Sequence, residues 1–288
     1  MPARARQPAA ETLRVGGITP LTTIDFPGKL AAVVFCQGCP WRCGYCHNPG
    51  LLDATQPGPL DWDDVLALLR QRHGLLDGVV FSGGEPLAQS GLPDALAQVR
   101  ALGYATALHT AGMYPERLAA ALPLLDWVGL DIKAPLHRYD AITGVPGSGV
   151  KAWDALRRLL GSGVAYECRT TWHPGLYPVE ELQALGQALR QLGLRHWVLQ
   201  PCEDKRAPGS ACSRAWRRYG PGWRWPRCGA ERLSTIFSGH QAVLVRALSS
   251  LLCRAKEKTY AMARNAPGPG DAGVGPGRLR RWRQCTGS

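Results

Sequence analysis

The sequence predicts an α/β fold built on a parallel sheet, and two observations carry this prediction. Short apolar runs recur along the first 202 residues, and each has the length and composition of a buried strand. Segments with apolar residues at helical spacing lie between most of these runs. This βα alternation is typical of either an open doubly wound sheet or a barrel, and the periodicity alone does not choose between them.

Six strands are expected, because each of these runs is rich in Val, Ala, Leu or aromatic residues. The first run, LAAVVF, leads directly into a group of cysteines, and the second, GVVF, leads into the sequence SGGEP. The later runs are YATALH, WVGLDI, VAYECRTT and WVLQ. In chain order, the expected strands are residues 30–35, 78–81, 104–109, 127–132, 164–171 and 197–200.

Five helices are expected between these strands. The first begins with an acidic turn, which favours a helix N-terminus, and the fourth is followed by Gly163, which is suited to ending a helix. In chain order, the expected helices are residues 61–73, 92–102, 115–124, 150–162 and 179–192. Residues 16–28 are expected to form a turn-rich approach to the first strand. Beyond the last strand, one further helix is expected at residues 241–256.

The net charge of +12 comes entirely from the end of the chain. Residues 1–202 hold 17 Lys and Arg against 17 Asp and Glu, whereas residues 203–288 hold 17 against 5. We therefore expect a disordered segment over residues 1–15, a neutral enzyme domain over residues 16–202 and a basic, irregular tail over residues 203–288. The tail fits a disordered extension or a segment translated in a shifted reading frame.

The composition also bounds the location of the protein. No run of 18 or more apolar residues predicts a membrane span, and the first residues lack the apolar core of a secretory signal. A cytoplasmic protein without a membrane partner is expected. In a reducing compartment, closely spaced cysteines favour metal binding over disulfides.

Four cysteines follow the first strand, and three of them have the spacing C-x3-C-x2-C. Cys39, Cys43 and Cys46 can hold three corners of a [4Fe–4S] cluster and leave the fourth iron open to a small ligand. A zinc site is the first alternative, but such sites usually use two well-separated pairs of ligands. A disulfide is the second alternative. Cys36 gives the reverse spacing with its neighbours, so we expect it to be a small buried residue outside the cluster.

Further candidates lie where other strands end. Gly83 and Gly84 allow a ligand to approach the backbone, and Glu85 can brace the turn, although a plain glycine turn is the simpler alternative. Lys133 has a flexible ammonium group that could reach a ribose or a carboxylate, or it could be an ordinary surface lysine. Arg169 could bind a carboxylate, or it could belong to a structural ion pair.

The cysteine spacing after a first strand, with an aromatic residue before the last cysteine, resembles the radical S-adenosylmethionine (SAM) superfamily. A longer match resembles the activating enzymes of glycyl-radical proteins, with the anaerobic ribonucleoside-triphosphate reductase activating protein as the most similar. The residues that carry this resemblance are Asp25 to Lys29, Gln37 to Cys39, Tyr45 to Pro49, Gly83 to Pro86, Leu108 to Gly112, Asp131 to Lys133 and Ile142 to Gly144. It covers residues 16–201 and none of the tail.

The resemblance implies an incomplete (β/α)6 barrel that holds one [4Fe–4S] cluster and S-adenosyl-L-methionine. It also implies reductive cleavage of this cofactor to a 5′-deoxyadenosyl radical, which takes a hydrogen atom from a glycine of a partner enzyme. A flavodoxin- or ferredoxin-type protein would supply the electron. In this interpretation Cys39, Cys43 and Cys46 hold the cluster. The expected cofactor-binding residues are Tyr45, Gly83, Gly84, Glu85, His109, Lys133 and Arg169. Activating enzymes often carry Asp where this chain has His109.

Two other classes of function remain open. The first is a radical enzyme that acts on a small molecule, similar to 7-carboxy-7-deazaguanine synthase. The second is a non-catalytic module that binds metal and nucleic acid, which the cysteines and the basic tail suggest. The zero net charge of residues 1–202 argues against nucleic acid as a partner.

Overall fold

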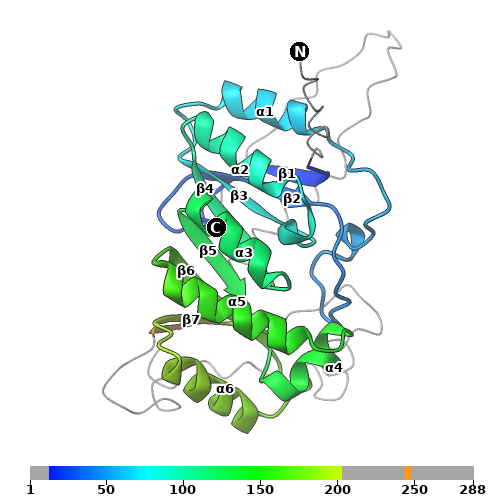
Figure 1. Ribbon diagram of the computed structural model, residues 1–288, viewed down its shortest axis with the longest axis vertical. Helices are drawn as coiled ribbons and strands as arrows, with labels where there is room; N and C mark the ends of the chain where they lie inside the picture. The colour runs from blue at the N-terminus through cyan, green and yellow to red at the C-terminus, as the bar shows by residue number, and fades with distance from the viewer. Residues whose placement is uncertain (1–12, 203–243, 248–288) are drawn as a thin grey trace, which may run out of the picture.

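The computed structural model describes residues 13–202 and 244–247, and these form one twisted sheet with helices packed along it (Figure 1). The strands lie side by side in sequence order. They are β1 (Val15–Thr22), β2 (Ala31–Cys36), β3 (Gly78–Gly83), β4 (Ala105–Thr110), β5 (Trp127–Asp131), β6 (Ala165–Trp172), β7 (His196–Pro201) and β8 (Leu244–Ala247). The α-helices are α1 (Trp62–Gln71), α2 (Leu92–Ala101), α3 (Pro115–Ala121), α4 (Tyr139–Thr143), α5 (Ser148–Ser162) and α6 (Val179–Gln191).

The sheet is parallel except at one edge. Strand β1 runs antiparallel to β2, and every later pair from β2 to β8 is parallel. Among the described residues no pairing joins β1 to β8, so the sheet does not close into a full barrel. The six expected strands and five expected helices are confirmed, with ends that shift by up to three residues, and the incomplete barrel is confirmed with them.

Two strands differ from the prediction. All of strand β1 except Val15 falls in residues 16–28, which were expected to be a turn-rich approach, and its glycines and proline hide any apolar alternation. It still pairs along the edge of β2, where Ile18 lies opposite Val34. Residues 244–247 form β8 beside β7, although a helix was predicted for residues 241–256. An open parallel edge offers unpaired backbone groups to such a segment.

The disorder expected for residues 1–15 is wrong for the last of them. Leu13 and Val15 lie inside residues 1–15 but are buried in the hydrophobic core. Residues 1–12 lie outside the described part of the chain, as do residues 203–243 and 248–288 of the predicted tail. Residues 115–124 form α3 followed by a separate 3₁₀ turn, Leu122–Leu124, because Pro123 cannot donate to the helix.

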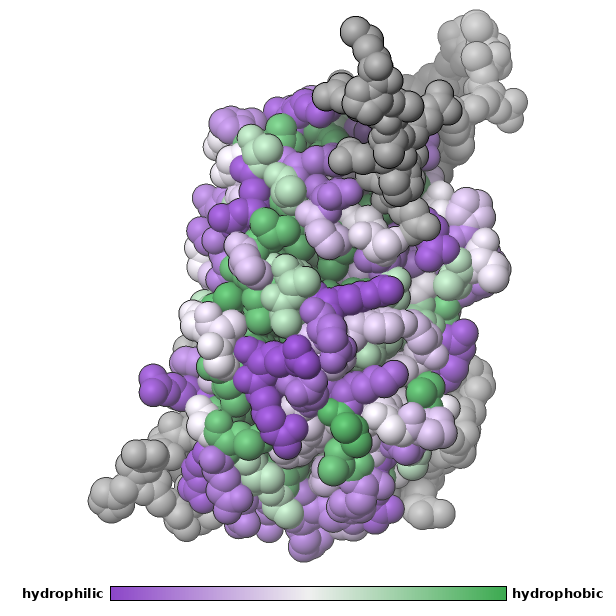
Figure 2. Space-filling view, in the orientation of Figure 1, coloured by the Kyte–Doolittle hydropathy of each residue, from purple (hydrophilic) through white to green (hydrophobic). Residues whose placement is uncertain are grey.

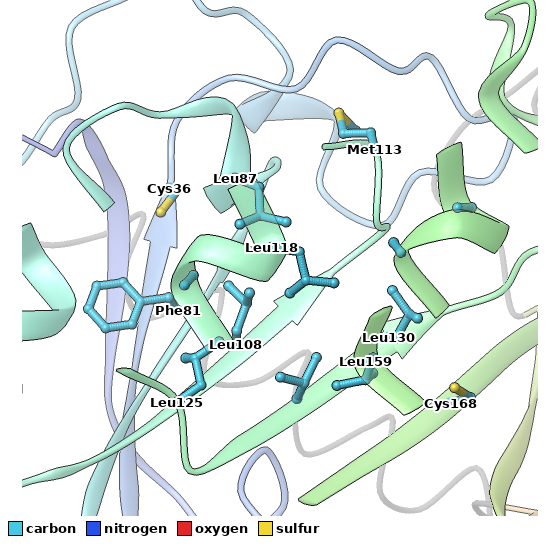
Figure 3. Close-up of a cluster of buried hydrophobic side chains, with 14 of the residues drawn as sticks. Cys36, Phe81, Leu87, Leu108, Met113, Leu118, Leu125, Leu130, Leu159 and Cys168 are labelled. Carbon is cyan, nitrogen blue, oxygen red and sulfur yellow. The ribbon is translucent and has the colours of Figure 1, made fainter. Parts of the chain in front are cut away.

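The main core lies between the sheet and the helices that cover its outer face. Figure 3 shows side chains from this layer, including Phe81 from β3, Leu108 from β4 and Leu118 from α3. A smaller cluster, which includes Val33, Val80 and Trp127, is separate from it. Hydrophilic residues cover much of the face seen in Figure 2, as expected for helices that bury only one side. No helix among the described residues is long and apolar enough to cross a membrane.

Candidate active site

The loop that follows β2 carries Cys39, Cys43 and Cys46, and we call residues 37–48 the cysteine loop. Hydrogen bonds between backbone groups fix its start, since the Gly38 N–H donates to the Leu51 carbonyl at 2.8 Å and the Cys39 N–H to the Leu52 carbonyl at 3.2 Å. The Cys46 N–H donates to the Cys43 carbonyl at 3.0 Å and tightens its end. The loop is therefore anchored before any ligand binds.

The three candidate ligands are free, half-buried thiols. Burial raises the pKa of the Cys39 thiol to about 12, and burial likewise raises the pKa of Cys43. Iron binds the thiolate, so assembly of a cluster releases these protons. Across residues 13–202 and 244–247, no three His, Cys, Asp or Glu side chains already converge as a metal site. The cysteines share one loop without meeting at one point.

Cys36 differs from the other three cysteines because it is fully buried at the end of β2. It packs among apolar side chains of the main core (Figure 3), and burial raises the pKa of its thiol far above its usual value. These surroundings agree with the expected role of a small buried residue.

Gly83 and Gly84 allow β3 to approach the cysteine loop closely. A Cβ atom on Gly83 would lie 2.4 Å from the backbone nitrogen of Cys36, and one on Gly84 would lie 2.3 Å from the carbonyl oxygen of Gly38. The Gly84 N–H donates to the Cys36 carbonyl at 2.9 Å, and the Glu85 N–H donates to the Gly38 carbonyl at 2.9 Å. Both positions thus require glycine because two backbone segments contact each other there, and the sequence did not reveal this contact.

Glu85 is buried, and its carboxylate faces the start of the next βα connection. One oxygen accepts from the Thr110 hydroxyl at 2.6 Å and from the Leu87 N–H at 3.1 Å, and the other accepts from the Ala111 N–H at 2.9 Å. Burial raises the pKa of this carboxyl group, although the three hydrogen bonds oppose the rise. Glu85 braces the turn, as expected from the sequence.

Lys133 and Asp131 form an ion pair at the end of β5, with the ammonium nitrogen 3.2 Å from a carboxylate oxygen. The ammonium group also lies 5.6 Å from the centre of the Tyr45 ring, which sits between Cys43 and Cys46 in the chain. Burial disfavours the charged form of Lys133, but the negative charge of Asp131 outweighs this effect. The pKa of Lys133 is therefore raised well above its usual value. This lysine is buried and faces the cysteine loop, so it is no ordinary surface lysine.

Arg169 lies on β6 beside this pair. Its Nε is 3.4 Å from Glu167, and its guanidinium carbon is 5.4 Å from the centre of the Trp127 ring. A Cβ atom on Gly129 would lie 1.6 Å from Nη2, so the guanidinium group lies directly over this glycine. Nε and Nη2 are buried and make no hydrogen bond within the described residues. Such donors suit a carboxylate ligand.

His109 lies on β4, two strands away from Arg169. Its Nε2 is 2.9 Å from the carbonyl oxygen of Asp25, and its ring meets the Trp127 ring edge-on at 5.6 Å. Trp127 therefore contacts both His109 and Arg169, and it links the polar side chains of β4 and β6.

Two tyrosines near the site were not predicted. The Tyr139 hydroxyl accepts from the Lys133 N–H at 2.9 Å, and the Tyr177 hydroxyl donates to the Lys133 carbonyl at 3.3 Å. Both are buried and hold the backbone of the lysine rather than its side chain. The only signal in the sequence was their position in the connections after two predicted strands.

The residues present fit the cluster and cofactor expected from the sequence. Three thiols on one anchored loop supply the donor chemistry of a site-differentiated [4Fe–4S] cluster. The buried Tyr45 hydroxyl lacks a hydrogen-bond partner in the described chain, as do two nitrogens of Arg169, so polar groups remain for a ligand.

Comparisons with known proteins agree with this chemistry. The family model described as the Radical SAM superfamily matches residues 33–189. A protein of Methanocaldococcus jannaschii named as a glycyl-radical enzyme activating enzyme is 28% identical over 206 residues, which cover 67% of this chain and 81% of that protein. The pyruvate formate-lyase-activating enzyme of Staphylococcus aureus (strain USA300) is 35% identical over 232 residues, which cover 69% of this chain and 91% of that enzyme.

Among solved structures, Streptococcus suis SuiB bound to S-adenosylmethionine is similar with a TM-score of 0.52 and 15% sequence identity. The match covers 77% of this chain and 51% of SuiB, so the chain spans about half the length of that protein. At this identity the likeness supports the fold alone.

Proposed function

This chain belongs to the radical SAM superfamily and to its glycyl-radical activating enzymes, and we propose that its partner is the anaerobic ribonucleoside-triphosphate reductase. The motif from Asp25 to Lys29 supports this partner, as does Ile142 to Gly144, because both contribute to the resemblance to the activating protein of that reductase. The observation that carries the chemistry is the anchored cysteine loop, whose Tyr45 lies 5.6 Å from the ammonium group of Lys133.

In this proposal Cys39, Cys43 and Cys46 hold a [4Fe–4S] cluster through their thiolates. When bound and reduced, the cluster supplies the electron that cleaves S-adenosylmethionine. A flavodoxin- or ferredoxin-type protein in the cytoplasm delivers this electron.

The charged side chains bind and orient the cofactor. Nη2 of Arg169 is buried and makes no hydrogen bond among the described residues, and this nitrogen binds the methionine carboxylate, whereas Nε lies 3.4 Å from Glu167. Lys133 is held by Asp131 at 3.2 Å and contributes a donor to the same cofactor. Tyr45 contacts the adenine, and His109 completes the polar side of the site from β4.

The glycine turn shapes the pocket from the other side. Gly83 and Gly84 hold β3 against the cysteine loop and present backbone groups to the methionine ammonium. Glu85 keeps its carboxylate on Thr110 and Ala111, so it acts by positioning this turn.

Anaerobic reconstitution with iron and sulfide, followed by dithionite and S-adenosylmethionine, tests the activity. We expect about four irons per chain and release of 5′-deoxyadenosine, and we expect neither from Cys43→Ala. The matched control Cys36→Ala should keep both. If the wild-type chain with all three ligands takes up the cluster and forms no 5′-deoxyadenosine, the proposed activity is wrong.

The partner is tested by adding purified anaerobic ribonucleoside-triphosphate reductase or pyruvate formate-lyase to the reduced enzyme. We expect a glycyl-radical signal by EPR with the reductase and a signal at least tenfold weaker with the lyase. A stronger signal with the lyase would overturn the proposed partner. Cofactor cleavage without any glycyl radical would favour the alternative of a small-molecule substrate, similar to that of 7-carboxy-7-deazaguanine synthase.

A further inference from the structure

The short helix α4 connects two parts of the site that are far apart in the sequence. At its end, the Thr143 carbonyl accepts from the Arg42 N–H at 2.8 Å, and the Ile142 carbonyl accepts from the Gly44 N–H at 3.2 Å. The last carbonyl groups of a helix have no partner inside the helix. Here α4 uses two of them to bind the cysteine loop on either side of Cys43.

The start of α4 contacts the other part of the site. The buried Tyr139 hydroxyl accepts from the Lys133 N–H at 2.9 Å. Its ring meets the ring of Trp41, a buried residue of the cysteine loop, edge-on at 6.1 Å. One helix of five residues thus contacts both the cysteine loop and the backbone of Lys133.

A chain of polar side chains holds α4 in place. Thr143 and Ser148 are fully buried, and their hydroxyl oxygens are 2.6 Å apart. The Ser148 hydroxyl is 3.0 Å from a carboxylate oxygen of Asp140. An ionised carboxylate only accepts, so Ser148 donates to Asp140 and Thr143 donates to Ser148. The Asp140 carboxylate also accepts from the Gly147 N–H at 2.9 Å and the Ser148 N–H at 3.1 Å.

Gly144 forms the turn that ends α4 beside the cysteine loop. It has a φ of 70°, which favours glycine, and ends α4 in the left-handed conformation. A Cβ atom placed on it would be in ordinary van der Waals contact with the cysteine loop, 3.6 Å from the Cβ atom of Arg42. The corner from Tyr139 to Ser148 is therefore shaped to pack on the cysteine loop.

We propose that α4 is the element that fixes the cysteine loop relative to Lys133, and that Thr143, Ser148 and Asp140 are its positioning residues. This inference rests on the proposed function, because it concerns how firmly the loop holds a cluster. None of the three side chains needs to touch the cluster. They restrict the backbone around Cys43, as partners of metal ligands commonly do, with effects of about 10- to 100-fold on metal affinity or activity.

The test compares Thr143→Val with Thr143→Ser, and Ser148→Ala with Ser162→Ala. Valine has the shape of threonine without its hydroxyl, whereas serine keeps the hydroxyl. Ser162 lies at the opposite end of α5, and its hydroxyl donates to the Leu159 carbonyl at 2.7 Å, so its variant removes the hydroxyl of an exposed serine far from the loop. The melting temperature of each metal-free variant shows that it folds.

Loss of iron to an anaerobic chelator is then measured on the reconstituted full chain. We expect about tenfold faster loss from Thr143→Val and Ser148→Ala, and rates within twofold of wild type from Thr143→Ser and Ser162→Ala. The EPR spectrum of the reduced cluster should change on addition of S-adenosylmethionine in wild type and Thr143→Ser, and less in Thr143→Val. If Ser148→Ala does not fold, the isosteric Thr143 pair decides the result.

The outcomes separate this inference from the proposed function. Wild-type rates of iron loss in folded Thr143→Val would overturn the inference and leave the function intact. Equally accelerated iron loss from Thr143→Ser and Thr143→Val would also overturn the inference, because the hydroxyl would then have no effect on cluster retention. A wild-type chain that takes up no cluster would overturn the proposed function and this inference together.

Discussion

The two sides of the site are built in different ways. On the cysteine side, at the ends of β2 and β3, the contacts run between backbone groups, such as the Gly84 N–H and the Cys36 carbonyl at 2.9 Å. On the charged side, at the ends of β4 to β6, they run between side chains, such as Lys133 and Asp131 at 3.2 Å. The cysteine side is thus fixed by close backbone approach, and the charged side by a cluster of charges.

This difference between the two sides shows which polar groups are still open to hydrogen bonds with a ligand. Both oxygens of Glu85 on the cysteine side are already used by Thr110, Leu87 and Ala111. On the charged side, Nε of Arg169 lies 3.4 Å from Glu167, but its buried Nη2 has no hydrogen bond among the described residues. A residue of a family motif can therefore serve the architecture of a site, while a residue on another strand keeps a donor open to a ligand.

The largest effect should come from the ligands on the cysteine side. Replacement of Cys39, Cys43 or Cys46 by alanine removes one corner of the cluster, so we expect loss of bound iron and no measurable cofactor cleavage. Replacement of Cys36 by alanine should lower the free energy of unfolding by about 1 kcal/mol and leave the iron content unchanged. Iron and sulfide analysis after reconstitution checks this. Loss of the cluster in the Cys36 variant would make that residue a fourth ligand.

The next prediction compares one glycine from each side. A methyl group at Gly84 meets the backbone of Gly38 at 2.3 Å, so Gly84→Ala should destabilise the metal-free chain by about 3 kcal/mol. A methyl group at Gly129 meets side-chain atoms instead of backbone, with Nη2 of Arg169 at 1.6 Å and the edge of the Trp127 ring at 2.9 Å. The flexible end of Arg169 can move away, and the ring must shift only slightly. Gly129→Ala should keep most of its stability and lose affinity for S-adenosylmethionine.

Urea unfolding and cofactor binding, measured on both glycine variants, check this contrast. Equal losses of stability would mean that the two sides do not differ in the way we infer. Retained cofactor affinity in Gly129→Ala would remove Arg169 from the binding site.

The sequence predicted the cysteine side and the charged side with different success. Three candidate ligands on one loop need only local spacing, so Cys39, Cys43 and Cys46 could be proposed before any fold was known. The contact of Gly84 with Gly38 could not be predicted in this way, because it depends on how β3 lies beside β2. The contact of Lys133 with the Tyr45 ring likewise joins residues that lie 88 positions apart in the chain.

The elements that were missed share one physical cause. Strand β1 has glycines and a proline in place of a regular apolar alternation, and it exists because β2 offers it an edge. Helix α4 has five residues, too few for a helical period to appear, and its ends are fixed by Arg42, Gly44 and Lys133. Elements stabilised by tertiary contacts carry little signal in their own sequence.

A smaller effect is expected from the arginine on the charged side. Arg169→Ala removes Nη2 as a hydrogen-bond donor to the cofactor carboxylate, and a charged bond of this kind is worth about 1.5–3 kcal/mol, so affinity should fall about 10- to 100-fold. Arg169→Lys should recover only part of it, because an ammonium group lacks the planar fork of a guanidinium. Isothermal titration with S-adenosylmethionine on the reconstituted enzyme measures both, with unchanged iron content as the control. Unchanged affinity in Arg169→Ala would contradict the assignment.

The smallest effect concerns how pH acts on the charged side. Burial works against the ionised form of Asp131, but Lys133 and Arg169 outweigh it, and the pKa of this carboxyl group is lowered. A lowered pKa in the folded state means that the ionised group stabilises the fold above its unfolded pKa of about 3.9. This contribution is lost as the pH falls through the folded pKa. Because Asp131 is partly exposed, we expect about 1 kcal/mol.

Urea unfolding of metal-free wild type and Asp131→Asn, from pH 7 down to pH 3, tests this prediction. The difference in stability should be constant above about pH 5 and should shrink below about pH 4, where the wild-type carboxylate takes up its proton. Asp154→Asn is the matched control, since it breaks an exposed pair with Arg158 at 3.0 Å and should change stability by at most about 0.5 kcal/mol. If the difference in stability between wild type and Asp131→Asn instead grows on acidification, burial outweighs Lys133 and Arg169 in setting the pKa of Asp131. The charged side would then resemble the environment of Glu85, where burial raises the pKa.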